Sequence, residues 1–223
     1  MARNFDLRSE QVRDLILDES ARVVADDGLL VIPTDTVYGI AADAFSAAGV
    51  ARLLAAKGRG RDMPPPVLIG QRSTLLGIAE ALDQRIMELT ERFWPGPLTI
   101  VCPAQPSLDW DLGDTHGTVA VRMPDHPLAL ELLARTGPLA VSSANTSGAP
   151  AAVTAAGAQE MLGDSVDVYL DGGEAPGQAS STIVDMTSQP PRILRAGPIG
   201  AAALREIVAD LADPECPDPD AGS

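Results

Sequence analysis

The fold of this chain is set by residues 29–59, LLVIPTDTVYGIAADAFSAAGVARLLAAKGR. The segment opens with a short apolar run, 29–32, whose β-branched members are typical of a strand buried on both faces. Pro33 cannot donate a hydrogen bond to a neighbouring strand, so the strand is predicted to end there. The polar residues 34–38 then form a loop. Ligands in open α/β sheets bind outside the carboxyl ends of strands, so this loop is expected to face a ligand.

The second half of the segment predicts a short helix with defined ends. Ser46 is a suitable N-cap, and the apolar residues among 50–54 recur with helical spacing. Gly58 is placed to end the helix in a left-handed conformation. This arrangement puts Lys57 on the last helical turn and Arg59 just beyond it.

Lys57 is the only lysine among 16 basic residues; the others are arginines. Two interpretations of it are about equally strong. A compact ammonium beside Arg59 and Arg61 suits a phosphate oxygen, but a lysine at a helix end is also favoured by the helix dipole. At a helix end Lys57 is expected to be exposed, so that its removal should leave the fold intact.

Composition excludes several classes of protein. The 223 residues suffice for a large core, and the 45% hydrophobic content includes only 3% aromatic residues. A net charge of −15 disfavours stable binding to nucleic acid or to an anionic membrane. No apolar run is long enough to cross a bilayer, and residues 1–11 lack a signal-peptide pattern, so a cytoplasmic protein is expected. Cys102 and Cys216 lack metal-ligand spacing, and no metal site is expected in the chain.

The pattern of strands and helices predicts a single α/β domain over residues 1–208, with a twisted, mixed parallel and antiparallel sheet flanked by helices. An acidic, proline-rich tail is expected over 209–223. The remaining elements are expected at 9–25 (helix), 67–69 (strand), 82–93 (helix), 98–102 and 118–122 (strands), 128–135 (helix), 139–141 (strand), 154–162 (helix), 166–170, 181–186 and 192–195 (strands) and 199–211 (helix).

Polar side chains recur at the ends of these predicted strands. They comprise the loop 34–38, Arg122, the loop 142–147 and Ser181–Thr182, with Arg195 further out. Hydroxyls, amides and backbone N–H groups of this kind hold phosphate or carboxylate oxygens. Each cluster alone is more often an ordinary turn or a structural ion pair. The chain contains no Walker A loop, dinucleotide fingerprint or nucleophile elbow.

Seven motifs in order resemble the YrdC-like threonylcarbamoyl-AMP synthase family, over roughly residues 10–208. They are PTDTVYGIAADA (33–44), KGR (57–59), FWPGPLT (93–99), VRMPDHP (121–127), SAN (143–145), STIVD (181–185) and ILRAG (193–197). Met63 and Leu68 stand where the family commonly has Asn and His. The resemblance implies a YrdC-like domain around an open cationic cavity.

The resemblance also implies a reaction: L-threonine, bicarbonate and ATP, with Mg²⁺, give threonylcarbamoyl-adenylate and pyrophosphate. A downstream tRNA threonylcarbamoyl transferase complex would then modify the adenosine next to the anticodon. Carried over by motif, the expected threonine contacts are Thr36, Arg122, Ser142 and Ser181. The expected ATP contacts are Lys57, Arg59, Met63, Ser143, Ala144, Asn145, Ala152 and Arg195, of which Lys57, Arg59, Ser143 and Asn145 form the catalytic set.

Two other functions remain open at this point. YrdC-like domains have been considered as double-stranded RNA-binding modules, although the net charge of −15 argues against that role here. A similar domain also serves carbamoyl transfer within a larger maturation enzyme, but the chain lacks the cysteine-rich and acylphosphatase-like segments that accompany it there.

Overall fold

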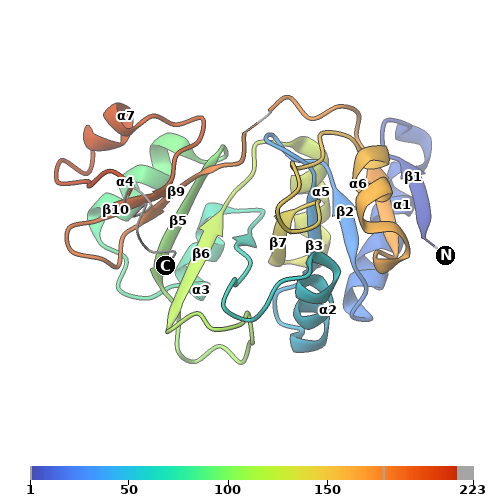
Figure 1. Cartoon of the computed structure of the whole chain (residues 1–223), viewed down its shortest axis with the longest axis horizontal. Helices are drawn as coiled ribbons and strands as arrows, with labels where there is room; N and C mark the ends of the chain where they lie inside the picture. The colour runs from blue at the N-terminus through green and yellow to red at the C-terminus, as the bar shows by residue number, and fades with distance from the viewer. Residues whose placement is uncertain (1, 178, 215–223) are drawn as a thin grey trace, which may run out of the picture.

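A computed structural model describes residues 2–177 and 179–214 and contains one ten-stranded sheet (Figure 1). Its strand order is β1-β8-β2-β3-β7-β4-β6-β5-β9-β10, and both parallel and antiparallel pairs occur, as the sequence predicts. The strands are β1 (Arg3–Asp6), β2 (Leu30–Ile32), β3 (Gly39–Asp43), β4 (Val67–Leu68), β5 (Leu98–Pro103), β6 (Thr118–Arg122), β7 (Leu139–Ser143), β8 (Val168–Asp171), β9 (Thr182–Asp185) and β10 (Arg192–Arg195).

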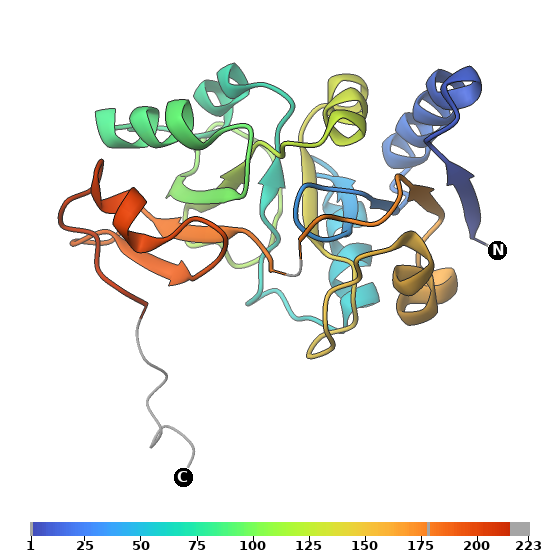
Figure 2. The same cartoon turned by 90° about the horizontal axis from the view of Figure 1, so that it is seen from above.

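The helices cover the two faces of the sheet unequally. They are α1 (Glu10–Ala25), α2 (Ala47–Lys57), α3 (Leu75–Ile78), α4 (Gln84–Phe93), α5 (Pro127–Thr136), α6 (Ala155–Leu162) and α7 (Ala201–Arg205). Figure 2 shows α1, α3, α4 and α5 on one side, with α2 and α6 on the other. On the second side, helices therefore cover only the part of the sheet that contains β8, β2 and β3. No helix in the described residues is both long and apolar enough to cross a membrane.

Segment 29–59 adopts the predicted strand, loop and capped helix. The Ser46 hydroxyl accepts a hydrogen bond from Gly49 N (2.9 Å), which satisfies a free amide of the first turn of α2. Gly58 ends α2 in the left-handed conformation, with φ of 64°. The strand β3, which pairs with β2 and β7, was not predicted. Its residues GIAAD are small and largely buried, so they lack the alternation that marks a half-buried strand.

Alternation along β5 and β6 leaves one face of the sheet free. On β5, Leu98, Ile100 and Cys102 are fully buried in a hydrophobic cluster under α4, whereas Thr99 and Val101 point away from it. On β6, Val119 and Val121 belong to the same cluster. Since side chains alternate along a strand, the opposite set forms a floor on the face that no helix covers.

The two ends of the described chain differ from expectation. The polar strand β1 was not predicted, because it joins the sheet edge beside β8 without an apolar pattern. The predicted helix 199–211 is limited to α7. Leu204, Val208 and Leu211 have helical spacing and are all buried, but the chain after Arg205 packs them through turns.

Packed structure continues beyond residue 208, where the tail was expected to begin. Leu211 belongs to the core cluster under α4, and Ala212 bridges to Arg192 beside β10. The fold therefore extends past the boundary placed at residue 209. Most of the expected tail, 215–223, lies outside the described residues.

Candidate active site

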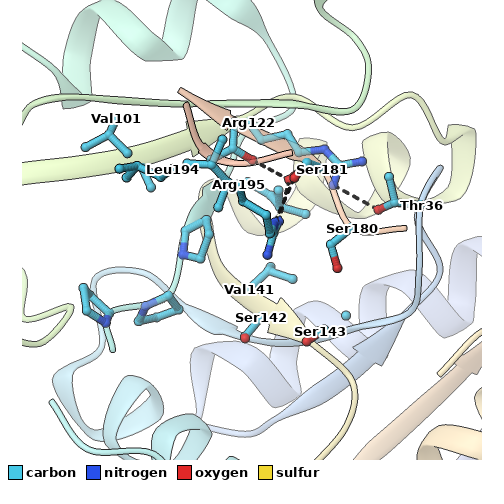
Figure 3. A pocket seen from close by; sticks show the side chains of 18 of the residues that line it. Thr36, Val101, Arg122, Val141, Ser142, Ser143, Ser180, Ser181, Leu194 and Arg195 are labelled. Atoms are coloured by element: carbon cyan, nitrogen blue, oxygen red, sulfur yellow. Dashed lines mark hydrogen bonds between the residues drawn. The ribbon is translucent and has the colours of Figure 1, made fainter. Parts of the chain in front are cut away.

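A cavity of about 370 Å³ lies over the uncovered face of the sheet, and three arginines line it. Arg59 follows α2, Arg122 ends β6 and Arg195 ends β10. Loop 34–38, the end of β7 and Ser180–Ser181 complete the walls, as Figure 3 shows for the residues it labels. The polar clusters predicted at separate strand ends are therefore brought together at one site.

Arg122 is held rigidly at one end of the cavity. Its Nε donates to Gly96 O (3.1 Å) and its Nη1 to the Thr36 hydroxyl (3.0 Å). Its Nη2 donates to Asp35 Oδ1 at 2.6 Å, in an ion pair whose side chains are 7% and 11% exposed. These contacts use three of the five guanidinium N–H groups and leave two for a ligand.

Asp35 has unused hydrogen-bonding capacity. Its second carboxylate oxygen, Oδ2, is buried and has no hydrogen-bond partner in the described structure. Nδ1 of His126 is likewise buried and has no hydrogen-bond partner among residues 2–177 and 179–214. Burial lowers the pKa of His126, and the charges of Asp35 and Asp125 partly oppose that shift. No contact was predicted for Asp35, although it lies inside the PTDT motif.

Arg195 and Ser181 lie beside Arg122, across the cavity from Ser142 and Ser143 (Figure 3). Arg195 Nε donates to Ser181 O (3.0 Å) and its Nη2 to Ser181 Oγ (3.1 Å). Ser181 Oγ also lies 2.7 Å from the Thr99 hydroxyl on β5. The serine hydroxyl therefore links the strand β5 to the guanidinium.

Arg59 contacts the end of β7. Its Nη1 donates to Ser142 Oγ (3.0 Å), while its buried Nε has no partner in the described structure. Ser143, the next residue of β7, also lines the cavity. Each of the three arginines thus donates to a hydroxyl: Arg59 to Ser142, Arg122 to Thr36 and Arg195 to Ser181.

The cavity carries a net positive charge within an acidic protein. Burial lowers the pKa of Arg195, and repulsion from Arg122 and Arg59 lowers it further. Burial lowers the pKa of Arg59 and of Arg122 as well. In the described part of the chain Arg122 has a carboxylate partner, whereas no salt bridge joins Arg59 or Arg195 to one. The two uncompensated guanidiniums favour an anionic ligand.

Lys57 lies behind this cavity and is not exposed as expected. Its side chain is 1% exposed and donates from Nζ to Ser143 O, to Asn145 O (2.8 Å) and to Asn145 Oδ1 (3.1 Å). Burial and the nearby Arg59 lower the pKa of Lys57 to about 7. The expectation that Lys57 could be removed without harm to the fold assumed an exposed side chain, and that assumption was wrong. Removing a buried, fully hydrogen-bonded group is expected to lower the stability of the protein.

Besides Lys57, four of the expected ATP contacts do not line the cavity. Asn145 is buried and bonded within its own loop. Ala144 N donates to Tyr38 O (2.7 Å), and Ala152 packs with Ala144 in a hydrophobic cluster. Met63 is 44% exposed and lies outside the lining. Motif position alone does not tell whether a residue faces the ligand or supports the loop that does.

The floor of the cavity was not predicted. It includes Thr99 and Val101 of β5, and Thr118 and Ala120 of β6. The signal in the sequence was a single polar residue, Thr99, within the apolar run LTIVC of β5. The predicted site consisted of polar groups at strand ends, and the floor lies instead on one face of the strands.

Known proteins resemble this chain in sequence and in fold. The family model Sua5_yciO_yrdC, described as "Telomere recombination", matches residues 22–197. The chain belongs to this family. A Mycobacterium leprae protein is 57% identical over 81% of this chain and 82% of its own length, and a Mycobacterium tuberculosis protein is 50% identical over 93% and 96%. Both carry the name "Putative threonylcarbamoyl-AMP synthase".

A solved structure also resembles the fold closely. Sua5 of Pyrococcus abyssi, described as complexed with L-threonine, superposes with a TM-score of 0.87 at 32% identity. The match covers 96% of this chain and 62% of the Sua5 chain. The family resemblance and the mixed α/β fold expected from the sequence are both confirmed.

Proposed function

We propose that this protein is an L-threonylcarbamoyladenylate synthase of the nucleotidyltransferase class. It would form threonylcarbamoyl-AMP and pyrophosphate from L-threonine, bicarbonate and ATP. The observation that carries the proposal is the convergence of Arg59, Arg122 and Arg195 on one cavity of a chain with a net charge of −15. The names of its relatives, and the threonine complex of Sua5, supply the substrate class.

Threonine would occupy the Arg122 end of the cavity. The two remaining N–H groups of Arg122 suit the carboxylate of an amino acid, and the hydroxyls of Thr36, Ser142 and Ser181 offer further contacts. The Asp35 carboxylate balances the charge of Arg122. This end is therefore nearly neutral and suits a zwitterion better than a polyphosphate.

ATP would occupy the Arg59 and Arg195 side, where the positive charge is uncompensated. Ser143 is available there for a phosphate oxygen. Among the described residues there is no group of three or more His, Cys, Asp or Glu side chains that could hold a metal ion. Magnesium would accordingly enter with the nucleotide, bound by its phosphates, as part of the substrate.

The reaction follows from placing two anions side by side. Threonine's ammonium first loses a proton to solvent, and the free amine then condenses with bicarbonate to give a carbamate and water. A carbamate oxygen attacks the α-phosphorus, the bond to the β-phosphate oxygen breaks, and pyrophosphate leaves. No protein atom bonds to the substrate. The guanidiniums of Arg59, Arg122 and Arg195 hold the reactants in place and stabilise the developing charge, which is the main source of catalysis in phosphoryl transfer.

A pyrophosphate-release assay tests the proposal. Release from ATP should require threonine and bicarbonate together, and mass spectrometry should detect threonylcarbamoyl-AMP. Equal release without threonine would exclude the synthase and favour the carbamoyl-transfer alternative. As a matched control, Arg52→Gln removes an exposed guanidinium of α2 that pairs with Asp167 outside the cavity, and it should leave the rate unchanged.

We also propose the setting of the reaction. A cytoplasmic location fits the ATP requirement, and the adenylate would pass to a tRNA threonylcarbamoyl transferase complex. Stable RNA binding by this chain is not expected, because the charge of −15 repels phosphates. A salt-dependent shift of double-stranded RNA at physiological ionic strength would instead support the RNA-binding alternative.

A further inference from the structure

The end of α2 and the loop 143–149 are joined by hydrogen bonds in both directions. The Lys57 ammonium donates to Ser143 O, Asn145 O and Asn145 Oδ1. In return, the Lys57 carbonyl accepts from Ser147 N (3.1 Å). One residue at the helix end therefore contacts three positions of the loop.

Asn145 completes the connection from the loop side. Its Oδ1 accepts from Lys57, and its Nδ2 donates to Thr146 O (3.0 Å) and Ala149 O (2.6 Å). Every polar group of the amide is thus bonded inside the protein. Asn145 is 6% exposed, and it has no polar group free for a ligand.

The Lys57 ammonium has as many N–H donors as there are acceptor oxygens around it. An ammonium has three N–H groups, and Lys57 uses them on three oxygens. A phosphate could be reached only by breaking one of these bonds in a buried place. The cavity wall is instead formed by Arg59 and Ser143, the last residue of the KGR motif and the first of the SAN motif.

We propose that Lys57 and Asn145 form a clasp, a pair of positioning residues that holds Ser143 and Arg59 at the cavity without contacting the nucleotide. The role of the clasp in turnover rests on the proposed function, whereas its role in ordering the loop does not. The clasp explains why the chain keeps a single lysine. Three oxygens converge on one small donor here, and a planar guanidinium would be too large for that space.

Amide hydrogen exchange of the ligand-free protein tests the clasp directly. Lys57→Met should raise the exchange rate of the loop amides, Ser147 above all, by about tenfold, the effect of losing a typical hydrogen bond. Asn145→Ala should do the same. Arg52→Met, which removes a cation from the exposed face of the same helix, should change nothing in the loop. Loop amides that exchange as in the wild type in both clasp variants would overturn the proposal.

A double-mutant cycle gives a second readout. Each single variant should lower kcat for pyrophosphate release by about 100-fold through displaced neighbours, and the double variant should be no worse than the poorer single one. Losses that multiply would mean two independent substrate contacts and would refute the clasp. If Lys57→Met does not fold, Asn145→Ala still decides through exchange. If the wild type lacks synthase activity, the exchange result stands and only the proposed function fails.

Discussion

Individual polar residues in this protein act through the partners that surround them. His126 is an example apart from Arg59, Arg122 and Arg195, because its surroundings change its protonation. Burial lowers its pKa from 6.5, and its Nδ1 has no partner in the described structure. The unfolded chain therefore takes up a proton below pH 6.5 that the folded protein resists, so that acid favours unfolding.

This effect of His126 can be measured. The free energy of unfolding should fall as the pH drops from 6.5 toward 5, by at most about 1.4 kcal/mol per pH unit from this one group. Urea titrations of the wild type and of His126→Gln should show a shallower pH dependence for the variant over that range. Identical slopes would mean that His126 titrates alike in the folded and unfolded states.

At the scale of elements, the end of α2 controls the site. Gly58 has a φ of 64° with open space around the position of a Cβ, so only backbone strain opposes a side chain there. Its left-handed conformation ends α2 at Lys57, which bonds to the loop after β7, and turns the following chain so that Arg59 enters the cavity. The end of α2, its Gly58 cap and the KGR motif therefore act together to place Lys57 and Arg59.

Gly58→Ala should destabilise the protein by about 1 kcal/mol, because an alanine is strained in the left-handed region. Gly77→Ala provides the matched control, since this glycine lies in α3, also with open space and without a positive φ. An alanine within a helix is expected to be neutral or stabilising by about 0.5 kcal/mol. Thermal unfolding of both variants measures the difference, and equal effects would contradict the role of the cap.

At the scale of the whole molecule, the C-terminal segment closes the core below β5, β9 and β10. Leu211 is 3% exposed and belongs to the same cluster as Leu98 and Ile100 of β5. The strand β5 carries core residues on one face and Thr99 of the cavity floor on the other. Loss of packing beneath this strand would therefore also affect the site above it.

Leu211→Ala should lower the free energy of unfolding by about 2–4 kcal/mol, the usual cost of a cavity in a core. Leu15→Ala on α1 is the matched control, because that leucine is 70% exposed and its truncation should change stability by about 0.5 kcal/mol or less. Denaturant unfolding compares the two variants. A small effect at Leu211 would mean that packed structure ends near residue 208.

Much of the architecture follows from local patterns in the sequence. Apolar patterns predicted α1, α2, α4, α5 and α6 and the central strands other than β3, because these segments bury defined apolar faces. Ser46 and Gly58 fixed the ends of α2, because capping depends on a few local residues. Motif order indicated the family, and it pointed to Arg59, Arg122 and Arg195 for the site.

Tertiary structure alone decided which side of each motif faces the ligand. Residues Lys57 and Asn145 lie in the same motifs as Arg59 and Ser143, but the first two bond to each other behind the wall. Small buried residues hid β3, and helical spacing after residue 205 suggested a helix that packing replaces with turns. Local patterns indicate which residues of a segment are buried. The direction in which a polar side chain points depends instead on its partners, which can be distant in the sequence: the Asn145 oxygens that accept from Lys57 are 88 positions away.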